Sequence, residues 1–290
     1  MSEQNSTALA TRRLDEMTSR EVEAYLAGGG DLIFVPFGPI SGHGAFIPLG
    51  IHAHWAEALG KLLAQMANGL LFPPVHCCYA GATQTFRGTV SYTIAEQAAT
   101  LVRTARLLHA QGFHRTVLIA GTSPEIMGGT FAARELFDQT GHPFWCIEAA
   151  RLLDHPEVKS MWEGYSGSFG ETVIGLASLK ILGRERPIPM AEWAREPKRD
   201  DGPDQPADIA GDVVALRRWG AVGFRYYSEG HHGNHGTAGI ECNGMNDIDL
   251  AVKTLERCAQ LLLPSLESLT RYSQWTGTHG FQYIRAQERL

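Results

Sequence analysis

Hydrophobic and polar residues alternate along the chain in blocks that predict strands separated by helices. The runs LIFVPFG (32–38) and RTVLIAG (115–121) are short, apolar and end in glycine, which is typical of strands buried on both faces. LLFPPVHCCYAG (70–81) and PFWCIEAA (143–150) are similar apolar segments. We expect two further strands there.

Between these runs, apolar residues recur at the spacing of amphipathic helices. The pattern predicts helices over 54–69, 93–112, 126–141 and 248–269. Strands that alternate with helices of this length form a largely parallel sheet covered on both faces. The expected fold is therefore α/β, a single three-layer α/β/α domain with a mostly parallel central sheet.

One stretch, residues 184–212, is charged and rich in proline. It has the composition of a linker between two domains. However, the roughly 80 residues that follow it are few for an independent domain. We therefore expect an excursion loop within one domain that spans 1–290.

Composition restricts the partners. The 290 residues carry 25 Lys and Arg against 31 Asp and Glu, for a formal net charge of -6, and contain no long basic run. Nucleic-acid-binding proteins ordinarily show a basic patch, and neither a signal peptide nor a membrane-length apolar run is present. We expect a cytoplasmic protein that acts on a small molecule and binds neither nucleic acid nor a membrane. Reduced core thiols are expected at the cysteines, which have no CxxC spacing: Cys77, Cys78, Cys146, Cys242 and Cys258.

The segment PFGPISGHGAFIPLGIHAHW (36–55) holds three histidines, His43, His52 and His54, between two apolar flanks. Such a loop is either a metal cradle or a tight turn that contains imidazoles. The residues that surround it in the sequence bear on this choice.

Four ordered blocks resemble the creatininase (creatinine amidohydrolase) family. They are FVPFGPISGHGAFIPLGIH, FPPVHCCYAGATQTFRGTVS, VLIAG and SGSFGETVIGLA. The resemblance extends over most of the chain. It implies a three-layer α/β fold, a homo-oligomer that is commonly a hexamer, and a dinuclear Zn, Mn or Fe centre that hydrolyses cyclic or formyl amides.

The chain departs from the family pattern at the metal ligands. The family's histidine in the first loop is present as His43. Its glutamate in that loop is replaced by Ser41, its bridging aspartate by His52, and its histidine in the third block by Thr122. An imidazole offers one lone pair to one metal, so His52 does not reproduce a carboxylate bridge. The hydroxyls of Ser41 and Thr122 are poor ligands for a divalent ion.

In the fourth block the family's glutamate is retained as Glu171, whereas its leading histidine is Ser166. Two histidines and one carboxylate, His43, His52 and Glu171, then remain for one divalent metal ion per chain. That set suits Zn best and also Mn or Fe. The alternative is a family member that binds no metal.

Other side chains are candidates for proton transfer and substrate binding. His54, Glu125 and His235 are candidate general acids, although His54 also suits a residue at a helix start and Glu125 suits a helix cap. Trp162 either closes over substrate or packs in the core. The residues assigned to substrate binding are Ser41, His76, Thr122, Trp162, Ser166, His231 and His232.

Together these residues predict a metal-dependent hydrolase of a small polar cyclic amide, or a related formyl amide, that uses a metal-activated water at a mononuclear site. One alternative is a carbon–carbon bond hydrolase that opens a cyclic polyhydroxy diketone of the inosose type. The resemblance extends to such enzymes, and a pocket richer in neutral donors suits a hydroxylated ring. Another alternative is a metal-free, non-hydrolytic family member or binder.

Overall fold

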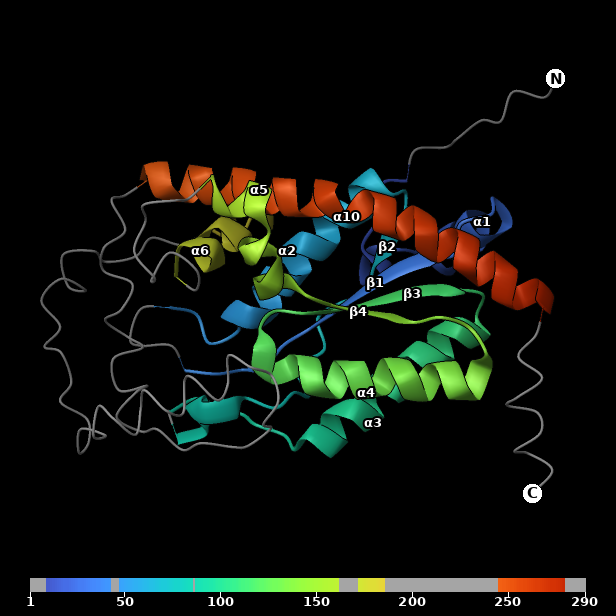
Figure 1. The fold of residues 1–290 in the computed structure, drawn as a ribbon, viewed down its shortest axis with the longest axis horizontal. Coiled ribbons are helices and arrows are strands. Elements are labelled where there is room, and N and C mark those ends of the chain that lie inside the picture. Colours follow the sequence, from blue (N-terminus) through green and yellow to red (C-terminus); the bar gives the residue numbers. More distant parts are fainter. Residues whose placement is uncertain (1–8, 43–46, 86, 162–171, 186–244, 280–290) are drawn as a thin grey trace, which may run out of the picture.

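A parallel sheet lies at the centre of the protein. The structure is a computed structural model that describes residues 9–42, 47–85, 87–161, 172–185 and 245–279. The described strands are β1 (Leu32–Phe37), β2 (Leu70–Leu71), β3 (Arg115–Ala120) and β4 (Trp145–Glu148), in the order β2-β1-β3-β4. Every pairing in this sheet is parallel, which confirms the predicted α/β fold (Figure 1).

Helices cover both faces of the sheet. α2, α5, α6 and α10 lie on one side, and α3 and α4 lie on the other (Figure 1). α1 packs through Tyr25 into the core of the second side. Their bounds are α1 Ser19–Ala27, α2 Ile51–Met66, α3 Ile94–Ala110, α4 Ser123–Thr140, α5 Pro156–Lys159, α6 Thr172–Ile181 and α10 Met245–His279. Short 3-10 turns occur at Leu14–Glu16, Gly81–Thr85 and Ala149–Asp154.

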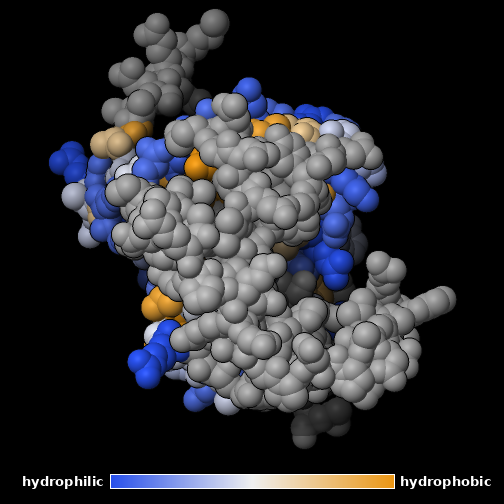
Figure 2. All heavy atoms as spheres, turned by 90° about the vertical axis from the view of Figure 1, so that its left-hand side faces the viewer, coloured by the Kyte–Doolittle hydropathy of each residue, from blue (hydrophilic) through white to orange (hydrophobic). Residues whose placement is uncertain are grey.

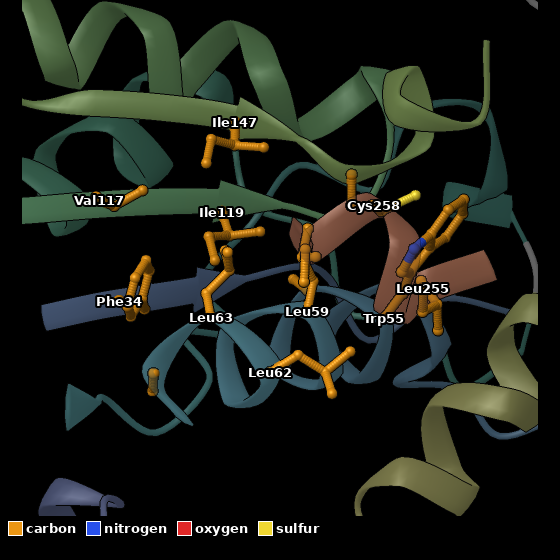
Figure 3. Packing of buried hydrophobic residues seen from close by; sticks show 14 of the residues in the cluster. Phe34, Trp55, Leu59, Leu62, Leu63, Val117, Ile119, Ile147, Leu255 and Cys258 are labelled. Carbon is orange, nitrogen blue, oxygen red and sulfur yellow. The ribbon is translucent and has the colours of Figure 1, made fainter. Parts of the chain in front are cut away.

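The core is divided in two by the alternation of side chains along the strands. Phe34 and Ile119 face α2, where they pack with Leu59 and Leu63 (Figure 3). Ile33, Val35 and Phe37 point to the opposite face and pack against α1, α3 and α4. Successive strand residues point to opposite faces, and both faces are covered here, so β1 is buried along its whole length.

Three strands end at the same level. Phe37 lies opposite Ala120, which lies opposite Glu148, so the carboxyl ends of β1, β3 and β4 form one edge. Figure 2 views the molecule from this end, where the visible described surface is mostly hydrophilic with small separate hydrophobic groups. In open parallel sheets this edge is the usual place for a ligand site.

Some element boundaries differ from the sequence prediction. The second strand was expected over 70–81 but ends at Leu71, because Pro73 and Pro74 lack the N–H that a sheet ladder needs. The helix expected from 126 begins three residues earlier, at Ser123. The final helix was expected over 248–269 but is longer, from Met245 to His279.

The cysteines are as predicted. Cys78 and Cys258 are buried, Cys77 and Cys146 are half-buried, and all four are free thiols. Burial raises the pKa of the Cys258 thiol to about 12, so this group stays protonated. Cys242 lies outside the described residues. In the described ranges, no helix is both long and apolar enough to cross a membrane.

Three histidines pack together at the other end of the sheet. His109 ends α3, His114 precedes β3, and His142 follows α4. The ring centroid of His109 is 4.8 Å from that of His114 and 4.6 Å from that of His142. Burial, and then the charges of His142 and His114, lower the pKa of His109 to about 4.

We expect this cluster to make the fold sensitive to acid. Because the pKa of His109 falls from 6.5 to about 4 on folding, its contribution to stability is complete above pH 6.5 and is lost as the pH falls toward 4. Urea unfolding of the wild type and of His109→Gln, followed across this range, measures the effect. The variant should lose less free energy of unfolding between pH 6.5 and pH 4. Equal pH slopes for the two proteins would contradict the prediction.

Candidate functional site

Two glycines bring α2 against the carboxyl edge of the sheet. Gly38 follows β1 and Gly121 follows β3, and the first turn of α2 packs on both. A Cβ at Gly121 would lie 2.3 Å from the backbone oxygen of His52, and one at Gly38 would lie 2.6 Å from the backbone nitrogen of Ala53. Real Cβ atoms do not approach so closely, so these glycines fix the position of His52.

His52, Thr122 and Glu125 form a buried hydrogen-bond network at this edge. His52 Nδ1 lies 2.9 Å from Glu125 Oε1 and 3.2 Å from Thr122 Oγ1. Glu125 Oε2 accepts hydrogen bonds from the backbone N–H of Thr122, at 2.9 Å, and from its hydroxyl, at 2.8 Å. Glu125 is thus both the cap expected for α4 and the partner of a candidate site histidine.

This network selects the tautomer of His52. A carboxylate oxygen only accepts hydrogen bonds, so Nδ1 of His52 carries the proton that it donates to Glu125. The lone pair then lies on Nε2, on the opposite side of the ring. Carboxylates orient metal-ligating histidines and histidine bases in this way.

Gln97 supports the network from behind and was not predicted from the sequence. Its side-chain Nε2 donates to the backbone oxygen of Glu125 at 2.6 Å, and its Oε1 accepts from the Tyr79 N–H at 2.9 Å. Gly128 allows α4 to pack closely against Gln97 of α3, because a Cβ at this position would lie 2.7 Å from Gln97 Nε2. The sequence signal for Gln97 was its position: a polar residue on the inward-facing side of a helix pattern.

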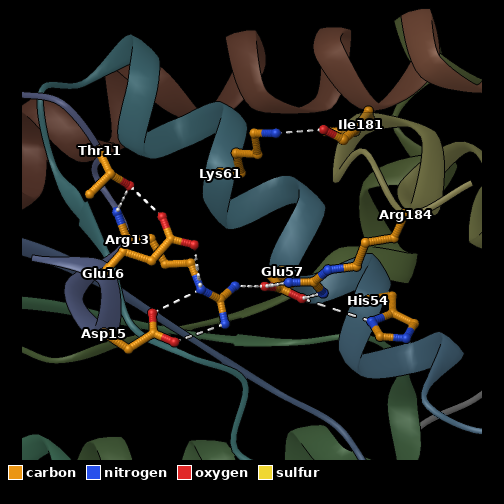
Figure 4. Close-up of polar contacts among 9 residues, drawn as sticks. All are labelled: Thr11, Arg13, Asp15, Glu16, His54, Glu57, Lys61, Ile181 and Arg184. Carbon is orange, nitrogen blue, oxygen red and sulfur yellow. Dashed lines mark hydrogen bonds and ion pairs between the residues drawn. The ribbon is translucent and has the colours of Figure 1, made fainter.

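His54 points to a different partner from His52. Its Nδ1 lies 3.8 Å from Oε2 of Glu57, a fully buried carboxylate one turn further along α2 (Figure 4). Glu57 also forms ion pairs with Arg13 and Arg184. The two Arg184 nitrogens lie 2.5 and 2.9 Å from the Glu57 carboxylate oxygens. Burial would raise the pKa of Glu57, but His54, Arg184 and Arg13 outweigh it and lower that pKa to about 2. The sequence signal for Glu57 was a lone carboxylate in an apolar helix.

The two remaining described candidates border the same edge. His76 Nδ1 donates to the backbone oxygen of Gly38 at 3.2 Å, and burial lowers the pKa of His76. Ser41 is fully buried, and its N–H donates to the oxygen of Leu49 at 2.8 Å. His76 therefore supports the turn after β1, whereas Ser41 closes the base of the loop that precedes α2.

The structure thus brings three predicted site residues into direct contact, His52, Thr122 and Glu125. No group of three or more His, Cys, Asp or Glu side chains in the described part of the chain is arranged to hold a metal ion. Two of the three predicted ligands, His43 and Glu171, are not among the described residues. The candidates that lie outside the described residues are His43, Trp162, Ser166, Glu171, His231, His232 and His235.

Comparison with known proteins identifies the family. The family model "Creatininase: Creatinine amidohydrolase" matches residues 15–235, most of the chain. The chain belongs to the creatininase family. No curated protein matches it. Members of this family are hydrolases, and family and fold together support a metal-dependent, amidohydrolase-type function.

Solved creatininase-family structures share the fold. A crystal structure of creatinine amidohydrolase (creatininase) is 18% identical, with a TM-score of 0.65, and covers 89% of this chain and 99% of its own. A putative creatinine amidohydrolase from Bacteroides fragilis is 16% identical, with a TM-score of 0.52, and covers 86% of this chain and 96% of its own. At such low identity the likeness concerns the fold alone.

We expect Gly121→Ala to destabilise the protein by about 2–3 kcal/mol, because its Cβ would meet the α2 backbone rather than a movable side chain. Gly141→Ala is the matched control. It has a φ of 69° but nothing within 4 Å of its Cβ position, so it should cost about 1 kcal/mol. Urea unfolding followed by circular dichroism measures both. Equal losses in the two variants would show that the close packing of α2 is not the constraint.

Proposed function

We propose that the protein hydrolyses a small, polar cyclic amide or formyl amide, with a water activated by one divalent metal ion per chain. Zn is the favoured ion, with Mn or Fe as alternatives. The observation that carries this proposal is the hydrogen bond from His52 Nδ1 to Glu125 Oε1, which places the proton on Nδ1 and the lone pair of the ring on Nε2, the atom proposed to bind the ion.

The residue types at the family's ligand positions suit one ion and not two. In the usual dinuclear centre, carboxylate and imidazole groups occupy the positions of Ser41, His52 and Thr122. Here the Thr122 hydroxyl donates a hydrogen bond to Glu125, and its neutral oxygen is a poor ligand for a divalent metal ion. We therefore propose His52 as one ligand, completed by His43 and Glu171.

Related structures support a metal ion in general terms. A creatininase mutant of the Zn-Zn type is 20% identical, with a TM-score of 0.62 over 89% of this chain. A creatininase described with Mn is also 20% identical, with a TM-score of 0.61 over 88% of this chain. The metal content of those proteins makes a divalent ion the first candidate for this chain.

A bound ion of this kind would lower the pKa of its bound water to near neutral. It would also act as a Lewis acid that polarises the amide carbonyl. Glu125 keeps the proton on Nδ1 of His52 and holds the imidazole in a fixed orientation. Gln97 keeps the first turn of α4 in place, and with it the carboxylate. These residues organise the site before substrate binds, which reduces the cost of ordering it during the reaction.

His54 is proposed to donate the proton that the leaving nitrogen needs when the amide bond breaks. Its Nδ1 faces Glu57, whereas its Nε2 lies beside Gly50, where a Cβ would be 3.2 Å from it. Gly50 ends the loop that carries the predicted ligand His43. The proposal therefore places the proton donor next to this loop.

The test combines metal analysis with substrate screening. We expect the purified, tag-free protein to bind about one Zn, Mn or Fe per chain and, when loaded, to open creatinine or another small cyclic amide, followed by mass spectrometry. His52→Ala should lose both the metal and the activity. Glu125→Gln should weaken metal binding about 10–100-fold, since it no longer orients the ligand. His109→Gln, at the far end of the sheet, is the control and should retain both.

Different results would redirect the proposal. Ring opening of a polyhydroxy cyclic diketone, with no turnover of amides, would identify a carbon–carbon bond hydrolase. Activity that withstands a chelator, in a protein that binds no metal, would contradict the metal-dependent hydrolase. Two metal ions per chain would contradict the mononuclear site.

A further inference from the structure

A cavity of about 430 Å³ lies beside α2, where the N-terminal segment and the end of α6 pack against it. It is lined by residues from these segments together with Leu71 of β2. Four cationic side chains line it, Arg12, Arg13, Lys61 and Arg184, against two carboxylates, Glu16 and Glu57. A cavity of this size accommodates a small organic molecule.

Two of the four cations are neutralised by close carboxylates. Arg184 forms a two-point ion pair with Glu57, and Arg13 pairs with Glu57 and with Asp15, whose Oδ1 lies 2.8 Å from its Nε (Figure 4). Glu16 is further away, 3.6 Å from Arg13 Nε. These groups form a charge network with little attraction left for an added anion.

The other two cations have uncharged partners. Lys61 Nζ donates to the backbone oxygen of Ile181 at 2.6 Å (Figure 4). Arg12 donates to the backbone oxygen of Gly69 at 3.1 Å and to Asn68 Oδ1 at 2.8 Å. A carbonyl oxygen holds a cation in position without cancelling its charge. The network of Arg13 and Arg184 with Asp15, Glu16 and Glu57 has one more carboxylate than cations, so Lys61 and Arg12 leave the site with a net positive charge, and partial burial strengthens its attraction for an anion.

Apolar side chains form much of the remaining wall: Leu9, Ala10, Ala64, Leu71 and Leu182. Ala64 and Leu71 are already buried, but a simple inorganic ion would leave Leu9, Ala10 and Leu182 in contact with water. A ligand with an anionic head and an apolar body would bury them, at a gain of roughly 25 cal/mol for each Å² removed from water.

We propose that this cavity binds a small organic anion, with a carboxylate or phosphate head against the cationic lining that Lys61 and Arg12 supply and an apolar body against the apolar wall. This site is separate from the His52 network. The proposal therefore does not depend on the hydrolase function.

Isothermal titration calorimetry with the full-length chain tests it. Phenyl phosphate and benzoate present the two anionic heads on the same apolar body, and benzyl alcohol is the uncharged comparison. We expect at least one of the anions to bind at one site per chain and benzyl alcohol to bind at least tenfold more weakly. The stronger anion identifies the preferred head. Added salt should weaken its binding.

Two variants test the location. Lys61→Gln removes the charge but retains a donor for Ile181, and should weaken the anion about tenfold, the usual size of one charged hydrogen bond. Arg12→Gln should weaken anion binding by a similar factor. It serves as the test variant if Lys61→Gln fails to fold. Lys253→Gln, on the exposed side of α10, makes the same charge change elsewhere and should bind as the wild type does.

His52→Ala completes the set and should retain anion binding. Loss of binding in that variant would place the anion at the proposed hydrolytic site and would overturn the cavity proposal. Equal weakening by Lys253→Gln, equal affinity for benzyl alcohol, or no saturable binding of either anion would also overturn it.

Discussion

The contact between the first turn of α2 and the two glycines after β1 and β3 is the constraint on which the site depends. It places the backbone of His52 directly against the sheet edge, where no side chain fits between them. The imidazole therefore reaches Thr122 and Glu125 from the neighbouring strand-to-helix connection. A helix held further away would leave the buried carboxylate of Glu125 without the imidazole, at a cost of several kcal/mol.

The altered residues act together rather than as separate losses. Thr122 caps α4 and donates a hydrogen bond to Glu125, and Glu125 also accepts a hydrogen bond from His52. A histidine in place of the family's bridging aspartate is thus matched by a carboxylate that fixes its tautomer. The replaced ligands and the hydrogen bonds among His52, Thr122 and Glu125 fit the proposed site, which has fewer metal ligands than the family's usual centre.

A second buried carboxylate, Glu57, organises the opposite side of α2. It joins the N-terminal segment through Arg13 and the end of α6 through Arg184, and it faces His54. A fully buried charge is tolerated only with close ion partners. The need to pair Glu57 therefore holds α2, the N-terminal segment and the end of α6 together. Lys61 and Arg12 lie beside this charge network with uncharged partners, which is the basis for the proposed anion cavity.

The sequence by itself determined the parallel α/β fold and most strand and helix positions, and it named His52, Thr122 and Glu125 as candidates for one site. Apolar periodicity and glycine placement are local signals, and the altered family motif marked the site residues. Only the tertiary structure decided that Glu125 binds His52, that Gln97 supports it, and that Glu57 pairs with Arg13 and Arg184. These contacts join residues 28 to 127 positions apart, and no local pattern encodes which distant side chain satisfies a buried charge.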